Sequence, residues 1–399
     1  MFRHLQIFAL VGLLAFLVMP EQNVPASLQS AAPREDSKCV SCHAEAGSYA
    51  HTAHRTTSSR ADDSTLQPMF ASAGNKLTIT SAPLPTLSFL MEKKDGRYLE
   101  TAVTGWGDDL ARVSEPIDVV VGSGKRGQTY LSWSENRLYE MPVSFWTEGH
   151  RWINSPGYID GTADFRRPVP AGCLECHVTA ITPLSQDASA SSYERESLIT
   201  GISCKTCHGP SEAHVIAARE AAASHTRLAE SAILNPAHFS RERKIDQCAV
   251  CHSGIQRVAL MPAFSYVPGS PLTKYFEPLP GANQDRPDVH GNQVGLLERS
   301  RCFRSSTQMT CSTCHNVHTA GQPVEAYAKK CLTCHQWQSC GQAHRLGVSI
   351  QGKCIGCHMP LQQTSAIVSV TAGVQVQATM RTHWIKVYGS DSRGLPRQP

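Results

Sequence analysis

The chain has 399 residues and a formal net charge of +4, with 41% hydrophobic and 18% charged residues. Ordinary soluble domains have about 45–50% apolar and about 25% charged residues, so both classes are sparse here. The low net charge and the many aromatic residues exclude disorder, and the length excludes a small disulfide scaffold. A single long apolar run excludes a multi-span membrane protein. The 16 cysteines therefore need another explanation.

The first residues are typical of an export signal. Arg3 and His4 precede an apolar stretch over residues 7–19, and small residues such as Ala26 follow it. A helix that spans a bilayer needs roughly 20 apolar residues, so this stretch is short for a membrane span. We expect a signal peptide over residues 1–26 and a periplasmic or extracellular location. An uncleaved N-terminal membrane anchor is the alternative.

Seven C-x-x-C pairs are each followed at once by a histidine. Histidine fills 18 of 399 positions, so chance alone has a probability of roughly 10⁻⁹ of placing all seven there. Zinc sites and disulfides also use C-x-x-C, but the trailing histidine is the signature of c-type haem, whose vinyl groups bind both thiols and whose iron binds the imidazole. In chain order, motifs 1 to 7 are Cys39, Cys42 and His43; Cys173, Cys176 and His177; Cys204, Cys207 and His208; Cys248, Cys251 and His252; Cys311, Cys314 and His315; Cys331, Cys334 and His335; and Cys354, Cys357 and His358. The sequence thus predicts seven covalently attached haems.

The motifs are unevenly spread along the chain. Motif 1 lies in a first haem-binding segment over residues 36–74, and alternating β-branched and aromatic residues with turn signals predict a small β-rich module over 75–150. We expect this module to be a structural cap over the haems or, alternatively, a docking or substrate-access surface. Motifs 2 to 7 crowd into a six-haem domain over 151–390, where we expect the haems to replace a conventional core. Residues 366–376 alternate like a strand, and 391–399 read as a frayed tail.

Distal iron ligands are sought among the histidines outside the motifs. His318 follows His315 by three residues, at most about 10 Å of chain, which is too short to reach the other face of the same haem. His214 follows His208 by six residues, mostly helical, and rises only about 9 Å. We expect both to bind the irons of neighbouring haems. The two remaining cysteines, Cys302 and Cys340, suggest a disulfide, with a distal thiolate ligand as the alternative.

Three segments resemble the exported multihaem cytochromes c. They are 204–214 (Cys-Lys-Thr-Cys-His-Gly-Pro with His214), 311–318 (Cys-Ser-Thr-Cys-His-Asn-Val-His) and 354–360 (Cys-Ile-Gly-Cys-His-Met-Pro). That superfamily includes pentahaem nitrite reductase, hydroxylamine oxidoreductase, octahaem tetrathionate reductase and the tetrahaem cytochrome of nitrifiers. The segments 300–311 and 382–385 look like an uncharacterised heptahaem branch of it.

The resemblance implies a fold and a set of ligands. It implies a mainly α-helical and irregular architecture, with parallel and perpendicular haem pairs. It also implies six distal iron ligands, which are His54, His214, His290, His318, His344 and His383. Related nitrite and tetrathionate reductases have a lysine in place of one motif histidine, whereas all seven motifs here end in histidine. Lysine-ligated catalysis is therefore not expected.

The sequence predicts a periplasmic cytochrome that relays electrons through bis-histidine haems. Its expected partners are redox proteins, with a membrane quinol oxidase or a terminal reductase as the candidates. Two propionates per haem change the charge of +4 to about −3 in the oxidised protein, so no nucleic-acid partner is expected.

Two alternatives stay open. One is an oxidoreductase with one open haem, acting on a small nitrogen or sulfur oxyanion held by the segment 145–152 with Arg166 and Arg167. The other is a subunit of a haem-stacked filament. No catalytic residue is predicted.

Overall fold

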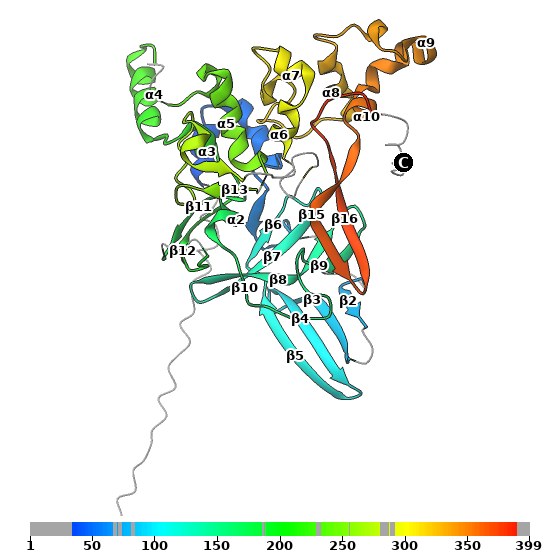
Figure 1. Cartoon of the computed structure of the whole chain (residues 1–399). Coiled ribbons are helices and arrows are strands. Elements are labelled where there is room, and N and C mark those ends of the chain that lie inside the picture. The colour runs from blue at the N-terminus through cyan, green and yellow to red at the C-terminus, as the bar shows by residue number, and fades with distance from the viewer. Residues whose placement is uncertain are drawn as a thin grey trace, which may run out of the picture.

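The computed structural model describes residues 34–388, except 67–69, 71–73, 81–83, 186, 188, 229–232, 255, 280–286 and 288–291. The predicted signal peptide and frayed tail lie outside this part of the chain. The described elements form two layers, with the short helices above and the sheets below in the view of Figure 1. Among the described residues, no helix has both the length and the apolarity needed to cross a bilayer.

Two antiparallel sheets form most of the β layer. The four-stranded sheet follows the chain as β2 (Lys76–Ile79), β3 (Thr86–Lys94), β4 (Arg97–Trp106) and β5 (Asp109–Pro116). The six-stranded sheet has the order β1-β6-β7-β8-β10, with β9 also paired to β8. Its strands are β1 (Ser58–Arg60), β6 (Val119–Val121), β7 (Gly127–Ser134), β8 (Arg137–Trp146), β9 (Arg151–Asn154) and β10 (Arg167–Pro168). Because β1 pairs with β6, the segment after motif 1 enters this sheet.

Two hydrophobic clusters hold the sheets. The first joins the two large sheets through fully buried side chains such as Phe89, Tyr130 and Met141. The second covers the other face of the six-stranded sheet and includes Tyr193 and Leu174, a residue of motif 2. Alternation along β7 and β8 explains why each of these strands contributes to both clusters. Motif 2 is therefore anchored in the β layer.

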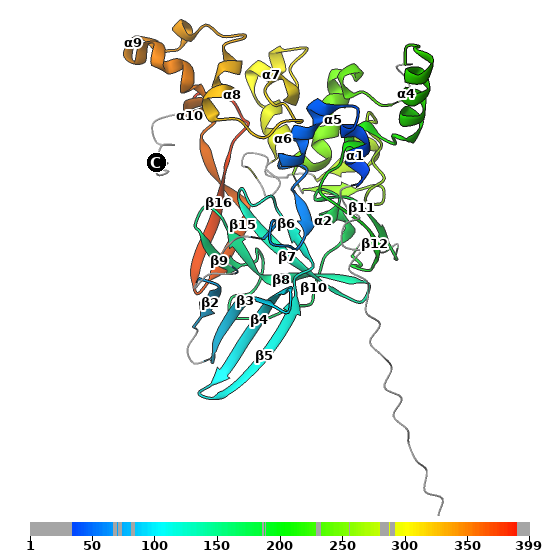
Figure 2. The same cartoon turned by 180° about the vertical axis from the view of Figure 1, so that it is seen from behind.

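Three hairpins lie between or after the motifs. They are β11 (Val178–Pro183) with β12 (Tyr193–Thr200), β13 (Arg257–Ala259) with β14 (Phe276–Pro278), and β15 (Leu361–Thr371) with β16 (Val374–Arg381). The last hairpin runs from the helical layer to the sheets, as the view from behind in Figure 2 also shows. At its tip, Asn154 donates to the Val370 carbonyl at 2.6 Å, and Asp160 accepts from the Gly373 N–H at 2.8 Å.

The helical layer consists of short elements. The α-helices are α1 (Arg34–Val40), α2 (Ala171–Leu174), α3 (Cys204–His208), α4 (Glu212–Ser224), α5 (Arg241–His252), α6 (Gln293–Glu298), α7 (Arg301–Ser305), α8 (Val324–Cys331), α9 (Ala343–Leu346) and α10 (Cys354–His358). The 3₁₀ turns are η2 (Ala44–His51), η5 (Pro236–His238), η6 (Leu272–Lys274), η7 (Cys311–Thr313), η8 (Trp337–Ser339) and η9 (Gly347–Gly352). Helices α3, α4 and α9 contain no buried residue.

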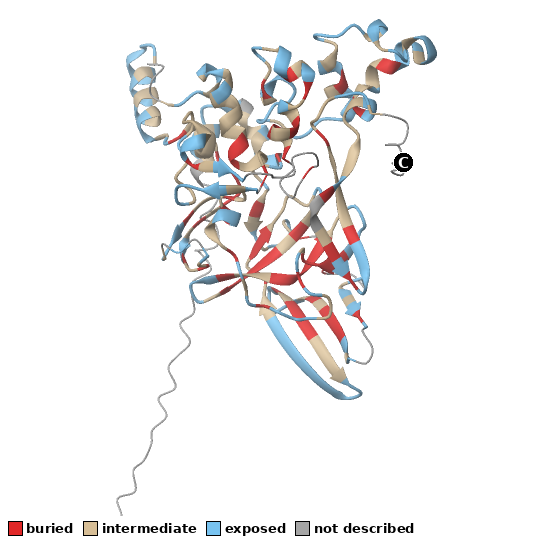
Figure 3. Ribbon diagram, viewed as in Figure 1, coloured by how far each residue is buried: buried red, intermediate tan, exposed pale blue. Residues whose placement is uncertain are grey.

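The expected mainly α-helical, haem-cored fold is wrong. The structure is only 29% helical and 31% strand, with several small sheets. Burial concentrates in those sheets, as Figure 3 shows, so side chains and not haems form the core there. The helical expectation overlooked the hairpins between motifs. It also read residues 366–376 as one strand, whereas Ala372 and Gly373, both with positive φ, form a turn between two.

Candidate functional site

Each motif folds as a single helical turn or as the end of a short helix. Motifs 3 and 7 are α3 and α10 themselves, while motifs 4 and 6 lie at the ends of α5 and α8. In motif 1 the His43 N–H donates to the Cys39 carbonyl at 2.8 Å, and motif 5 repeats this bond between His315 and Cys311 at 2.9 Å. Residues four apart lie on one face of a helical turn, so the thiols and the imidazole of a motif can reach the same porphyrin.

Four motif histidines face a histidine from another part of the chain. The ring centres of His43 and His214 are 6.3 Å apart, and those of His208 and His318 are 6.1 Å apart. The other two pairs are His54 with His252 at 6.0 Å and His315 with His383 at 6.2 Å. Four of the six predicted distal ligands thus lie opposite a motif histidine, in each case one from a motif that they do not directly follow.

The spacing of these pairs fits an iron ion between the rings. Two imidazoles that bind one metal ion on opposite sides, through metal–nitrogen bonds of about 2 Å, have ring centres about 6 Å apart. The four separations therefore match the requirements of bis-histidine ligation.

Hydrogen bonds to Nδ1 orient several motif histidines. The Nδ1–H groups of His208 and His358 donate to the carbonyls of Leu234 and Lys386, both at 3.0 Å. Nδ1 of His177 lies 3.1 Å from Oγ1 of Thr57. A carbonyl acceptor fixes the proton on Nδ1 and leaves the lone pair of Nε2 for a metal.

Burial favours the neutral imidazole at four of the paired histidines. Desolvation, with smaller effects from His252 and His315, lowers the pKa of His54 to about 4. Desolvation likewise lowers the pKa of His383 to about 4, with His315 as the next cause. The pKa values of His315 and His318 are also lowered, again mainly by burial. Only a neutral imidazole binds a metal, so these sites are ready for ligation near neutral pH.

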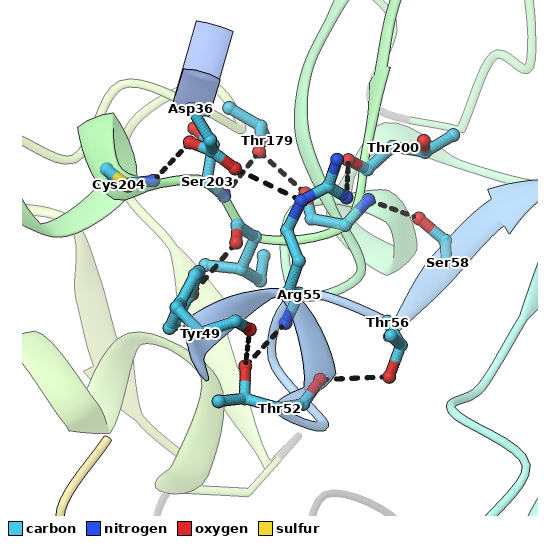
Figure 4. Close-up of polar contacts among 12 residues, drawn as sticks. Asp36, Tyr49, Thr52, Arg55, Thr56, Ser58, Thr179, Thr200, Ser203 and Cys204 are labelled. Carbon is cyan, nitrogen blue, oxygen red and sulfur yellow. Dashed lines mark hydrogen bonds and ion pairs between the residues drawn. The ribbon is translucent and has the colours of Figure 1, made fainter. Parts of the chain in front are cut away.

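A polar cluster joins the segment around motif 1 to motif 3. Asp36 accepts from the backbone N–H of Cys204 at 3.0 Å and forms an ion pair with Arg55 at 3.1 Å. Tyr49 donates to the Ile202 carbonyl at 2.8 Å (Figure 4). Sequence reasoning missed these residues because they lie outside the motifs and have no pattern of their own. Their contacts fix the relative positions of two motifs.

Other predicted residues lie elsewhere. His344 is exposed on α9, His335 is exposed in motif 6, and His290 lies outside the described residues. Cys302 and Cys340 are free thiols in place of the expected disulfide. The two cysteines lie near different motifs. Burial raises the pKa of Cys314 in motif 5, and the nearby Cys302 adds to this effect. Burial likewise raises the pKa of Cys354 in motif 7, and Cys340 adds to it.

The expected oxyanion-binding segment is built into the fold. Phe145 and Trp152 are buried in the first hydrophobic cluster. Arg166 forms an ion pair with Glu115 at 3.2 Å, and Arg167 forms one with Glu140 at 2.8 Å. These guanidinium groups therefore already have carboxylate partners.

One comparison with known proteins gave a match. Residues 128–209 match the family described as cytochrome c554 and c-prime. This region contains motifs 2 and 3 and the strands β7 to β12. No curated protein and no solved structure matches the chain. The family match and the attachment motifs together support a c-type cytochrome with covalently bound haem.

Proposed function

We propose that the chain is a periplasmic heptahaem c-type cytochrome that relays electrons through bis-histidine haems. The four cross-motif histidine pairs carry this proposal, because their separations of 6.0–6.3 Å suit an iron held from both sides. Each of the seven motifs supplies two thiols for attachment and one proximal imidazole.

Bis-histidine ligation suits electron transfer better than substrate chemistry. Bound haem supplies an iron that changes oxidation state by one electron. The protein's part would be to hold the iron between two imidazoles and to fix their orientation, as the carbonyl of Leu234 does for His208. With two histidines as ligands, such a haem would leave no place for a small ligand and would exchange electrons with little rearrangement.

The N-terminal sequence supports export, and thioether attachment of haem takes place outside the bacterial cytoplasm. The donor we propose is a quinol-linked redox protein, and the acceptor is a terminal reductase. Seven haems would make the net charge negative, so we expect no nucleic-acid partner.

Haem content and spin state test the proposal together. Full-length protein produced with a haem-attachment system should contain seven haems by the pyridine haemochromogen assay and intact mass. Its EPR spectrum in the oxidised state should be dominated by low-spin ferric haem. A protein with fewer haems would contradict the proposal. A high-spin signal that shifts with added nitrite would instead favour an oxidoreductase with one open haem.

A further inference from the structure

Motif 4 contacts motif 2 and the segment after motif 1. The Cys176 thiol of motif 2 lies 3.9 Å from the carbonyl oxygen of Val250, which is part of motif 4. His54, which follows motif 1, lies opposite His252 of motif 4. Motif 4 therefore lies between the motif that is anchored in the β layer and the rest of the helical layer.

Motif 5 is the next neighbour of motif 4. Helix α5, which ends in motif 4, contacts η7, which contains the first residues of motif 5. Arg241 at the start of α5 donates to the carbonyls of Met309 and Phe303 at 3.0 and 3.1 Å. The thiols of Cys248 and Cys311, one from each motif, are also neighbours. These contacts bring two attachment sites together.

Motifs 6 and 7 form an arm that begins beside motif 5. The Tyr327 ring of α8 lies 5.1 Å from the ring of His315 in motif 5. Helix α8 ends in motif 6 and contacts α10, which is motif 7. The views in Figures 1 and 2 both place α8, α9 and α10 at the end of the helical layer away from α4. Motifs 6 and 7 thus continue outward from motif 5.

Motifs 1 and 3 face each other beside this row. His214, which follows motif 3, lies opposite His43 of motif 1. Asp36 ties α1, the helix that leads into motif 1, to Cys204 of motif 3. His318, which follows motif 5, lies opposite His208 of motif 3. The pair therefore contacts the row at both motif 4, through His54, and motif 5.

We propose that electrons cross the molecule through the haems of motifs 2, 4, 5, 6 and 7, in that order or its reverse, while the haems of motifs 1 and 3 form a side pair. The proposal rests on the proposed function, because it needs haem at every motif. In each step one ferrous iron is oxidised and the neighbouring ferric iron is reduced by one electron. A redox partner at each end supplies or removes that electron. The haems of motifs 4 and 5 are the junction that every electron passes.

The order of the irons is the first test. Anomalous scattering from crystals of the haem-loaded full chain locates each iron. The iron of motif 4 should be the nearest neighbour of the iron of motif 2. Among the irons of motifs 1 to 5, that of motif 5 should be the nearest to the iron of motif 6. An iron of motif 1 or 3 in either position would overturn the path. A loss of haems from the protein would instead contradict the proposed function, so the two failures are distinguishable.

Electron injection from the two ends is the second test. A photoactive ruthenium label is attached to Leu184→Cys, on the hairpin after motif 2, or to Val348→Cys on the arm; these side chains are 55% and 68% exposed. Both labels use a Cys302→Ser, Cys340→Ser background, because these thiols would otherwise react. His383→Met or His214→Met then raises the potential of the haem of motif 5 or motif 1 and marks it spectrally.

The path predicts different results for the two labels. Electrons from the arm should reach the methionine-ligated haem of motif 5 severalfold faster than the methionine-ligated haem of motif 1. On the proposed path they arrive at motif 5 first and need further transfers to reach motif 1. Electrons from Leu184→Cys should reach both at similar rates, since each is two steps from motif 2. Equal rates from the arm, or faster arrival at motif 1, would overturn the path. Counting seven haems in each labelled variant shows that the chain is fully loaded.

Discussion

The carboxylate of Asp36 accepts a hydrogen bond from the backbone N–H of Cys204 at 3.0 Å, which ties α1, the helix that leads into motif 1, to the first residue of motif 3. Arg55 neutralises the same carboxylate and also donates to the Thr200 carbonyl at 3.3 Å. Three separate segments of the chain therefore come together around the Asp36 carboxylate and the Arg55 side chain that pairs with it. Both side chains are about four-fifths buried, with exposures of 18% and 21%.

Replacing Asp36 by Ala should destabilise this junction. The change leaves the Arg55 guanidinium largely buried without its carboxylate, which costs about 1–3 kcal/mol of unfolding free energy. Chemical denaturation followed by Soret absorbance measures the loss. The control is Lys93→Ala, which removes the exposed ion pair with Asp63 but keeps the hydrogen bond that Tyr98 donates to Asp63, and should barely shift the midpoint. Equal effects of the two variants would contradict the role of the junction.

Gly201→Ala tests the close packing of the same junction. An added Cβ would lie 2.1 Å from the carbonyl oxygen of Arg55, and the residue has φ of +68°. Gly96→Ala is the control, since its φ is +75° but no atom lies within 4 Å of the new Cβ. Backbone strain costs both variants about 1–2 kcal/mol. Thermal unfolding should show a clearly larger loss for Gly201→Ala, and similar losses would refute the clash.

Removing one distal histidine should change the spin state of one haem. In His214→Ala the haem of motif 1 loses its sixth ligand, so one low-spin EPR signal should become high-spin. His225→Asn is the control, because His225 is exposed at the left-handed C-terminal residue of α4, a conformation that asparagine tolerates. An unchanged spectrum in His214→Ala would show that another group binds that iron.

Glu100 should make stability depend on pH. It is fully buried in the β layer, and its Oε1 accepts from the Val143 N–H at 3.0 Å. Burial raises its pKa well above the ordinary 4.5, and the Val143 bond offsets this only in part. Between pH 4.5 and the raised value, the folded chain holds one proton more than the unfolded chain. Its stability therefore falls as pH rises through that window, by about 1.4 kcal/mol per pH unit.

The neutral variant Glu100→Gln isolates this effect. It keeps the acceptor for Val143 but has no proton to lose, so its unfolding midpoint should lack that part of the pH slope. Denaturation series at several pH values, followed by tryptophan fluorescence from the buried Trp152, give the comparison. Identical slopes for the wild type and the variant would show that Glu100 is ionised in the folded chain.

Local patterns in the sequence identified the attachment motifs, because a thioether-bound haem needs two thiols and an imidazole at fixed spacing. They also indicated strands before residue 150, where turn signals such as Lys94-Asp95-Gly96 separate alternating segments. Pairings between distant segments left no such local trace. The contact of β1 with β6 and the burial of Leu174 in the β layer depend on tertiary packing. Chain length predicted that His318 cannot reach the other face of the haem of its own motif, but not that it lies opposite His208.

The hairpin β15–β16 also sets an order of events during synthesis. It separates His358 of motif 7 from His383, which lies opposite His315 of motif 5. A chain made from its N-terminus exposes the thiols of motif 5 long before residue 383 exists. Until then His315 lacks the ring that lies opposite it in the folded chain, and the Ser300 hydroxyl lacks the His383 carbonyl to which it donates at 2.9 Å. Completion of the last hairpin therefore brings the C-terminal His383 to a motif that was made about 70 residues earlier.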